Sequence, residues 1–208
     1  MWLSAKSKVN WKEATDHLSR VDPILAAVIE RTGPCTLKPR GDCFLNLCRA
    51  IISQQISGNV AIAIMKRFKK LFSRSRPNPK HLLTLSDEQL RSAGLSRQKM
   101  TYLRDLAKHF TEGKIPTRRF SRMTDEEIIQ SLIPVKGIGR WTAEMFLIFV
   151  LNRTDLLPVD DLGVRKGFQK LYGLRTEPKA AKMIQIAEKW RPWRTVGSWY
   201  MWRGCKQS

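Results

Sequence analysis

Hydrophobic residues recur at helical spacing along nearly the whole chain. In the segment 96–113 one face collects Met100, Leu103, Leu106 and Phe110, which is the pattern of an amphipathic helix. The same spacing predicts helices over 10–21, 22–33, 42–57, 58–72, 86–94, 124–133, 139–152, 161–173, 177–190 and 192–204. No stretch alternates polar and apolar residues as a half-buried strand does, and no repeat or low-complexity linker interrupts the series. The pattern predicts a compact all-α protein with short connections.

Helix boundaries are marked by residues that cap helices. Asp22-Pro23 is a typical helix start, and Gly33 is a typical stop. Thr124 with Glu127 three residues later forms a capping box at the start of another helix. These signals agree with the hydrophobic spacing, which strengthens the helical prediction.

The length allows one domain, or two lobes that share the chain, with a core of ordinary size. The longest apolar run, Met145–Leu151, is far shorter than the roughly 20 residues of a membrane-spanning helix. The N-terminal stretch lacks an apolar block of signal-peptide length, so we expect a protein that is neither exported nor membrane-bound.

The charge of the chain indicates the class of molecule that it binds. There are 38 Lys and Arg against 18 Asp and Glu, a formal net charge of +20, and the basic residues are spread over most of the chain. Such a balance favours a polyanionic partner, above all a nucleic acid. The alternative is a basic protein with solvated faces, and charge alone does not exclude it.

The four cysteines, Cys35, Cys43, Cys48 and Cys205, match no zinc or iron–sulfur spacing. We expect reduced thiols, as in a cytosolic or nuclear protein.

The segment "IPVKGIG" joins two predicted helices by a tight glycine turn, which makes a helix–hairpin–helix unit. Glycine lets a ligand approach the backbone closely. The amides of Gly137, Ile138 and Gly139 precede a helix, where unpaired N–H groups and the helix dipole favour an anion. Lys136 and Arg140 add positive charge, so a DNA phosphate fits. A glycine-rich turn without a ligand remains the alternative.

The wider sequence resembles a known family. The segments "LIPVKGIGRWTAEM" and "LLPVDDLGVRKGF", with "IISQQISGNVA" before them and "WRPWRTVGSWYMWR" after them, are similar to helix–hairpin–helix (HhH-GPD) DNA glycosylases of the alkylbase, or 3-methyladenine type II, branch. The resemblance covers about residues 40–205. It implies two helical lobes around a cleft, about 1–40 with 153–208 and 41–152 with its hairpin at 125–152, and no N-terminal β domain.

The resemblance also implies the activity, which is to flip a damaged base out of duplex DNA and cut its N-glycosidic bond. It marks Asp161 as the catalytic residue. A carboxylate near C1′ stabilises the positive charge that develops on the sugar and orients water. The alternative is a helix cap, a role for which we expect Asp160.

Trp141 stands where lyase members of the family carry a nucleophilic lysine, which implies a monofunctional enzyme that uses water. Trp141, Met145 and Trp202 fall where the alkylbase branch lines its base pocket, and indole faces attract cationic alkylated purines. For most of the other C-terminal tryptophans, Trp190, Trp193 and Trp199, we expect core packing. The three histidines lie outside the motifs, consistent with a leaving group that needs no general acid.

Further DNA contacts are expected from the same correspondence. Gln55 falls at the position of the wedge that fills the gap left by the flipped base, although it could equally face solvent, and Gln54 could be structural. Candidate backbone contacts are Arg97, Lys99, Lys136, Arg140, Thr142, Arg165 and Lys166. The resemblance also implies a Na⁺ or K⁺ ion on the carbonyls of Ile133, Val135 and Ile138, with no cofactor needed for bond cleavage.

We therefore expect a monomeric enzyme that excises 3-methyladenine- and 7-methylguanine-type bases from damaged duplex DNA. It would act in the cytoplasm at the nucleoid of a bacterium, or in the nucleus of a eukaryote. Two alternatives stay open: a glycosylase for deaminated or oxidised bases, and a non-catalytic DNA-binding protein that uses the hairpin alone.

Overall fold

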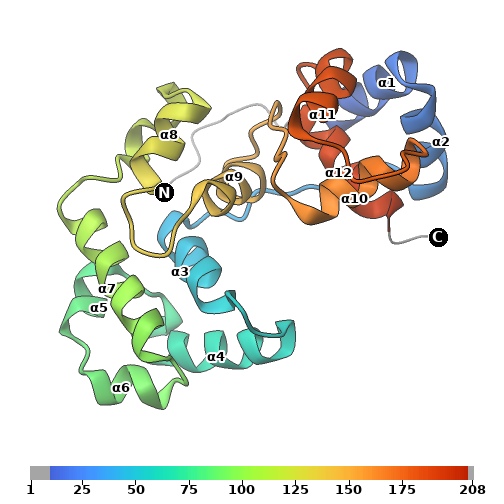
Figure 1. The fold of residues 1–208 in the computed structure, drawn as a ribbon. Coiled ribbons are helices and arrows are strands. Elements are labelled where there is room, and N and C mark those ends of the chain that lie inside the picture. Colours follow the sequence, from blue (N-terminus) through green and yellow to red (C-terminus); the bar gives the residue numbers. More distant parts are fainter. Residues whose placement is uncertain (1–9, 206–208) are drawn as a thin grey trace. The chain divides into compact units, whose positions relative to one another are not determined.

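The computed structural model describes residues 10–205, and all regular structure in that range is helical (Figure 1). No helix in this range has the length and apolar character needed to cross a bilayer. The described chain divides into two compact units. One consists of the two ends of the chain, up to Pro39 and from Leu151 onward, and the other is the continuous stretch Arg40–Val150.

The continuous unit, which we call the hairpin unit, holds nine helical segments: α3 (Cys43–Ser53), α4 (Gly58–Lys70), η1 (Ser73–Ser75), α5 (Pro79–Thr84), α6 (Asp87–Ser92), α7 (Arg97–Thr111), η2 (Thr117–Arg122), α8 (Asp125–Leu132) and α9 (Arg140–Phe149). Its core forms where α7 packs against α3 and α5. The apolar face predicted for the segment 96–113 is confirmed, because Leu103, Leu106 and Ala107 are fully buried.

The discontinuous unit, which we call the terminal unit, holds α1 (Trp11–Val21), α2 (Pro23–Thr32), α10 (Leu162–Leu171), α11 (Ala180–Ala187), η3 (Glu188–Trp190) and α12 (Arg194–Gly204). The first two helices pack against α12, so the chain start folds onto the C-terminal segment. Two glycines allow close packing around α12. A Cβ on Gly197 would lie 2.4 Å from the Trp190 ring, and one on Gly167 would lie 2.6 Å from the Met201 carbonyl oxygen.

A buried carboxylate ties the two ends of the terminal unit together. Asp22 caps α2, with its Oδ1 atom 3.1 Å from the Ile24 amide nitrogen, and its side chain is fully buried. Its other oxygen accepts hydrogen bonds from the Tyr172 hydroxyl and from the Trp190 indole N–H, and lies 3.2 Å from the Lys189 ammonium. The predicted cap at Asp22 is therefore confirmed, and it is also a link between distant parts of the chain.

Candidate active site

The hairpin connects α8 to α9 through residues 133–139. Val135 and Ile138 are buried, and the Ile138 amide donates to the Val135 carbonyl over 3.0 Å. The turn is thus anchored by its apolar residues. Gly139 stands immediately before α9 with no side-chain cap, so the amides at this helix start depend on other acceptors.

The two glycines of the hairpin differ in backbone conformation and in surroundings. Gly137 has φ +83°, and a Cβ on it would lie 2.2 Å from Cδ2 of Tyr102, so the fold itself requires glycine there. Gly139 has φ −91°, and a Cβ on it would have no neighbour within 4 Å. Nothing inside the described protein therefore demands glycine at 139.

One of the two cationic side chains at the hairpin forms an ion pair within the protein. Lys136 is exposed, but its backbone amide donates to the Asp105 carboxylate over 2.8 Å. Arg140 makes a bidentate ion pair with Glu126, with N–O distances of 3.0 and 2.6 Å. Hydrogen bonds from Arg140 and Gln130 lower the pKa of Glu126 to about 2. The hairpin therefore presents Lys136 outward, while Arg140 already has a carboxylate partner.

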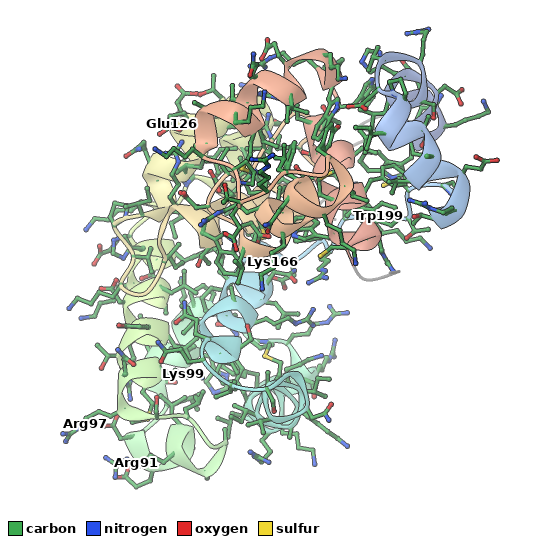
Figure 2. All side chains as sticks on the ribbon, turned by 45° about the vertical axis from the view of Figure 1, so that its right-hand side comes forward. Arg91, Arg97, Lys99, Glu126, Lys166 and Trp199 are labelled. Carbon is green, nitrogen blue, oxygen red and sulfur yellow. The ribbon has the colours of Figure 1, made fainter. Side chains whose placement is uncertain are left out.

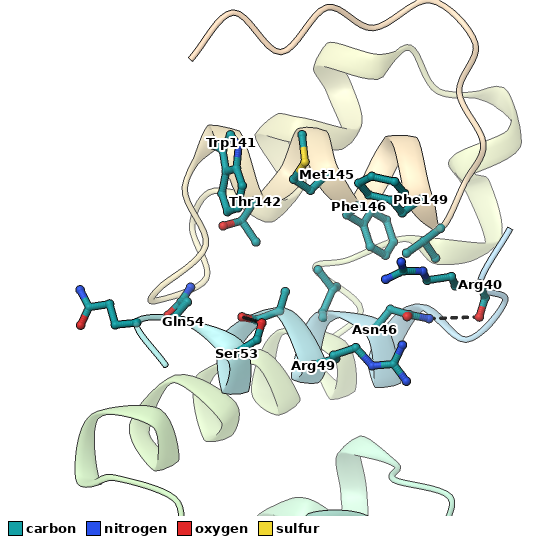
Figure 3. Close-up of a pocket in the computed structure, with 14 residues that line it drawn as sticks. Arg40, Asn46, Arg49, Ser53, Gln54, Trp141, Thr142, Met145, Phe146 and Phe149 are labelled. Carbon is teal, nitrogen blue, oxygen red and sulfur yellow. Dashed lines mark hydrogen bonds between the residues drawn. The ribbon is translucent and has the colours of Figure 1, made fainter. Parts of the chain in front are cut away.

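A pocket of about 460 Å³ lies in the hairpin unit between α3 and α9 (Figure 3). From α9 come Trp141, Met145, Phe146 and Phe149, and from α3 and its ends come mostly polar side chains, Arg40, Asn46, Arg49, Ser53, Gln54 and Gln55. Trp141 remains half-exposed, whereas Thr142, predicted as a DNA contact, is buried and lines the pocket. The structure brings together Trp141 and Met145, as predicted for a base pocket.

The loop between α3 and α4 presents two glutamines with different environments. Gln54 donates its side-chain amide to the Gly137 carbonyl over 2.7 Å, so it is tied to the hairpin. Gln55 is exposed and has φ +55°, a left-handed conformation that costs energy for a residue with a side chain. The wedge candidate is therefore held in an unusual conformation at the rim of the pocket.

Asp161 lies in the terminal unit at the start of α10. Its Oδ1 atom accepts from the Val164 amide over 2.9 Å and from the Trp202 indole N–H over 2.7 Å, and the residue is only 8% exposed. The expectation that Asp160 caps this helix is wrong, because Asp161 is the extended residue directly before Leu162 and supplies the capping oxygen. Trp202 is thus brought to Asp161, while Trp141 and Met145 belong to the other unit.

Of the other cationic candidates, some are exposed and others bond to residues of the protein itself. Arg97 extends away from the ribbon (Figure 2), and its side chain makes no hydrogen bond or ion pair within residues 10–205. Lys166 is also exposed. Lys99 instead donates to the Ile52 carbonyl over 2.6 Å, and burial lowers its pKa. Arg165 pairs with Glu177 over 2.7 Å. Lys99 and Arg165, predicted as phosphate contacts, have internal partners.

Two residues that support the hairpin were missed by the sequence reasoning. Tyr102 packs under Gly137, and Asp105 accepts from the Lys136 amide. Their spacing of three residues on a helix was visible in the sequence. However, nothing in the sequence indicated that this helix face meets the hairpin.

Comparisons with known proteins agree with this geometry. Residues 48–192 match the family model of the HhH-GPD superfamily base excision DNA repair proteins. DNA-3-methyladenine glycosylase 1 of Schizosaccharomyces pombe is 35% identical over 93% of this chain and 87% of its own length. The crystal structure of a DNA-3-methyladenine glycosidase from Bacillus halodurans has a TM-score of 0.85 and is 32% identical, covering 97% of this chain and 92% of that one.

A further solved structure contains nucleic acid. The 3-methyladenine DNA glycosylase Mag1 of S. pombe, in complex with abasic DNA, has a TM-score of 0.83 and 34% identity, with coverage of 94% of this chain and 98% of that one. Helical fold, glycine hairpin and sequence similarity point the same way. The chain belongs to the HhH-GPD superfamily of base excision DNA repair proteins.

Proposed function

We propose that this chain is a monofunctional DNA glycosylase that releases alkylated purines from duplex DNA by hydrolysis. The observation that carries the proposal is the fixed carboxylate of Asp161, which is held by the Trp202 indole at the start of α10. The names of the relatives, which are 3-methyladenine glycosylases over nearly the full chain, support the same substrate class.

The reaction breaks the bond between C1′ of deoxyribose and a purine nitrogen. The bonding electrons leave with the base, so a base made cationic by alkylation departs neutral and needs no general acid. Asp161 stabilises the positive charge left on the sugar and orients water, which attacks C1′ and loses a proton. The products are a free base and an abasic site.

The residue at position 141, one past Arg140, bears on the choice between hydrolysis and lyase chemistry. Trp141 has no amine with which to form a Schiff base, so the covalent route of lyase relatives is closed at this position. We assign Trp141 and Met145 to one wall of the base pocket, since both line the pocket between α3 and α9. Trp202 would add a further indole beside the catalytic carboxylate.

DNA binding would be shared by the amides of Gly137 and Gly139, since the Ile138 amide already donates to Val135, and by the exposed cations Arg97, Lys136 and Lys166. Gln55 would fill the space of the flipped base. A Na⁺ or K⁺ ion fits the hairpin, because the carbonyls of Ile133, Val135 and Ile138 are neutral oxygen donors of the kind hard cations prefer. Such an ion would add positive charge to the hairpin and would take no part in bond cleavage. We expect a monomer that acts where the cell keeps its DNA, the nucleoid or the nucleus.

The substitution Asp161→Asn tests the mechanism. Asparagine keeps an oxygen that can cap α10 and accept from Trp202, so the melting temperature should change little. Base release under single-turnover conditions should fall by roughly 10²-fold or more, because the charge that stabilises the transition state is gone. Binding to duplex DNA that contains 7-methylguanine should survive.

Undiminished release by this variant would remove Asp161 from the mechanism. The substrate class is tested by incubating the wild-type protein with methylated, uracil-containing and 8-oxoguanine DNA, and identifying the released bases by mass spectrometry. Release from only the second or third DNA would favour a different lesion. Inactivity on all three would favour a non-catalytic DNA-binding protein.

A further inference from the structure

Three residues of α7 contact the two segments of the hairpin unit that we propose to bind DNA, namely the hairpin and the end of α3 with its following loop. Lys99, Tyr102 and Asp105 follow one another at intervals of three, so they lie along one side of the helix. Each contacts a segment that the proposed function places on DNA. None of these contacts involves the terminal unit.

Lys99 fixes the start of the wedge loop, which we define as residues 54–57. Its ammonium donates to the Ile52 carbonyl over 2.6 Å, in the last turn of α3. A cation at a helix C-terminus satisfies a carbonyl that lacks an intrahelical partner and interacts favourably with the helix dipole. The position at which α3 ends and the loop begins is therefore tied to α7.

Tyr102 and Asp105 fix the hairpin. The Tyr102 ring fills the space beside Gly137 so closely that a Cβ would lie within 2.2 Å of it. Asp105 accepts from the Lys136 amide over 2.8 Å, and His109 lies 3.6 Å from the same carboxylate oxygen. The hairpin backbone is thus held by packing and by a hydrogen bond to one charged acceptor.

A further contact with the hairpin comes from Gln54. Its side chain donates to the Gly137 carbonyl over 2.7 Å, which joins the wedge loop directly to the hairpin. The residue that follows is Gln55, with φ +55°. An unfavourable backbone conformation persists only where the surroundings hold it, and these contacts supply such surroundings.

We infer that Gln54, Lys99, Tyr102 and Asp105 are positioning residues that set the separation between Gln55 and the phosphate-binding amides of the hairpin. The inference rests on the proposed function. Flipping requires that one segment grips the backbone while the other enters the stack, and a displacement of about 1 Å in such an arrangement can cost on the order of 10²-fold in rate. The contacts matter most when the lesion is well paired, because flipping is then most costly.

Gln54→Met is the first test, since methionine has similar length and no donor. Two duplexes carry 7-methylguanine, opposite either cytosine or a position that lacks a base. We expect release from the paired duplex to fall about tenfold, as for the loss of one hydrogen bond to a part-buried acceptor, while release from the unpaired duplex falls less than about twofold. Equal losses on both duplexes, or no loss, would overturn the inference.

A matched pair of lysine variants separates positioning from charge. Lys99→Met and Lys108→Met remove the same charge from the same helix, but Lys108 is exposed and makes no side-chain hydrogen bond or ion pair in the described range. Base release from the paired duplex should be reduced in Lys99→Met and unchanged in Lys108→Met. Identical behaviour of the two variants contradicts the role assigned to Lys99. Should Lys99→Met fail to fold, Asp105→Asn replaces it, and we expect an intermediate defect because asparagine can still accept from Lys136.

Stack opening gives a readout that needs no bond cleavage. A 2-aminopurine beside the lesion becomes brighter when the stack is invaded, and Gln54→Met should reduce this signal on the paired duplex. A wild-type protein that opens the stack but releases no base would contradict the proposed catalysis and leave the positioning role supported. An unchanged signal in Gln54→Met would count against positioning whether or not base is released.

Discussion

Asp22 shows how one buried residue can hold a discontinuous unit together. Burial by itself would raise its pKa, but hydrogen bonds from Tyr172, Trp190 and Leu25, with the charge of Lys189, hold the pKa below its ordinary value. The carboxylate is therefore ionised and fully bonded in the folded protein. Its side-chain partners lie in the C-terminal half of the chain, so its loss should loosen the junction of α2 with α10 and η3.

Asp22→Asn should lower the free energy of unfolding at pH 7 by about 1–3 kcal/mol, because charged hydrogen bonds become neutral or are lost. The folded pKa is depressed, so the contribution is present above the unfolded pKa and is lost as pH falls through the folded value. The difference between wild type and variant should thus shrink from pH 7 to pH 3 in urea denaturation. Asp16→Asn is the control, since its exposed pair with Lys12 should contribute less than about 1 kcal/mol. A pH-independent difference would contradict the charge argument.

The internal partners of charged residues were the part of the site that could not be predicted from the sequence. Lys99, Arg140 and Arg165 were expected on phosphates, yet they bond to Ile52, Glu126 and Glu177 respectively. A sequence gives the charge of a side chain but not its partner. These partners lie 47, 14 and 12 residues away in the chain, beyond the reach of helical spacing rules.

At the scale of the elements, we expect alanine substitutions of the two hairpin glycines to affect stability differently. Gly137→Ala should lower the free energy of unfolding by about 1–3 kcal/mol, because the new methyl group meets the Tyr102 ring and φ is +83°. Gly139→Ala should change it by less than about 0.5 kcal/mol, since its backbone is ordinary and its surroundings are open.

Both glycine variants should bind duplex DNA more weakly, for different reasons. The alanine methyl group at 139 would stand where the backbone of DNA approaches, and the change at 137 would distort the turn. Thermal unfolding and an equilibrium binding assay on the same preparations separate the two effects. Gly139→Ala with unchanged affinity would show that this glycine does not face DNA.

Helices were largely predictable because spacing and caps agreed. The capping box predicted at Thr124 is present, and the predicted core role of Trp190 and Trp199 is confirmed by their burial. The short helix α5 was missed, although Asn78 followed by Pro79 is a start signal, because six residues carry too little periodicity. The contacts that join α7 to the hairpin could not be predicted, since they depend on tertiary packing.

For the whole molecule, a net charge of +20 should make DNA binding strongly salt-dependent. Arg97→Gln should reduce the slope of log K against log salt by about 0.9, because an exposed cation that meets one phosphate releases one counterion. Arg165→Gln should leave the slope nearly unchanged, since that guanidinium is already paired with Glu177. Titrations at several salt concentrations measure both, and equal slopes for the two variants would contradict the assignment of exposed and engaged cations.

The division of the chain has a consequence for how the protein is made. On a ribosome, α1 and α2 emerge first, yet the helices they pack against come only after the whole stretch Arg40–Val150 has been synthesised. At about 5–20 residues per second, that delay lasts on the order of 5–20 seconds. During this interval the apolar faces of the first two helices lack their final covering, and the hairpin unit can fold before the unit that carries Asp161 is complete. The hairpin that we propose to bind DNA would therefore be folded before the carboxylate that we propose for catalysis is in place.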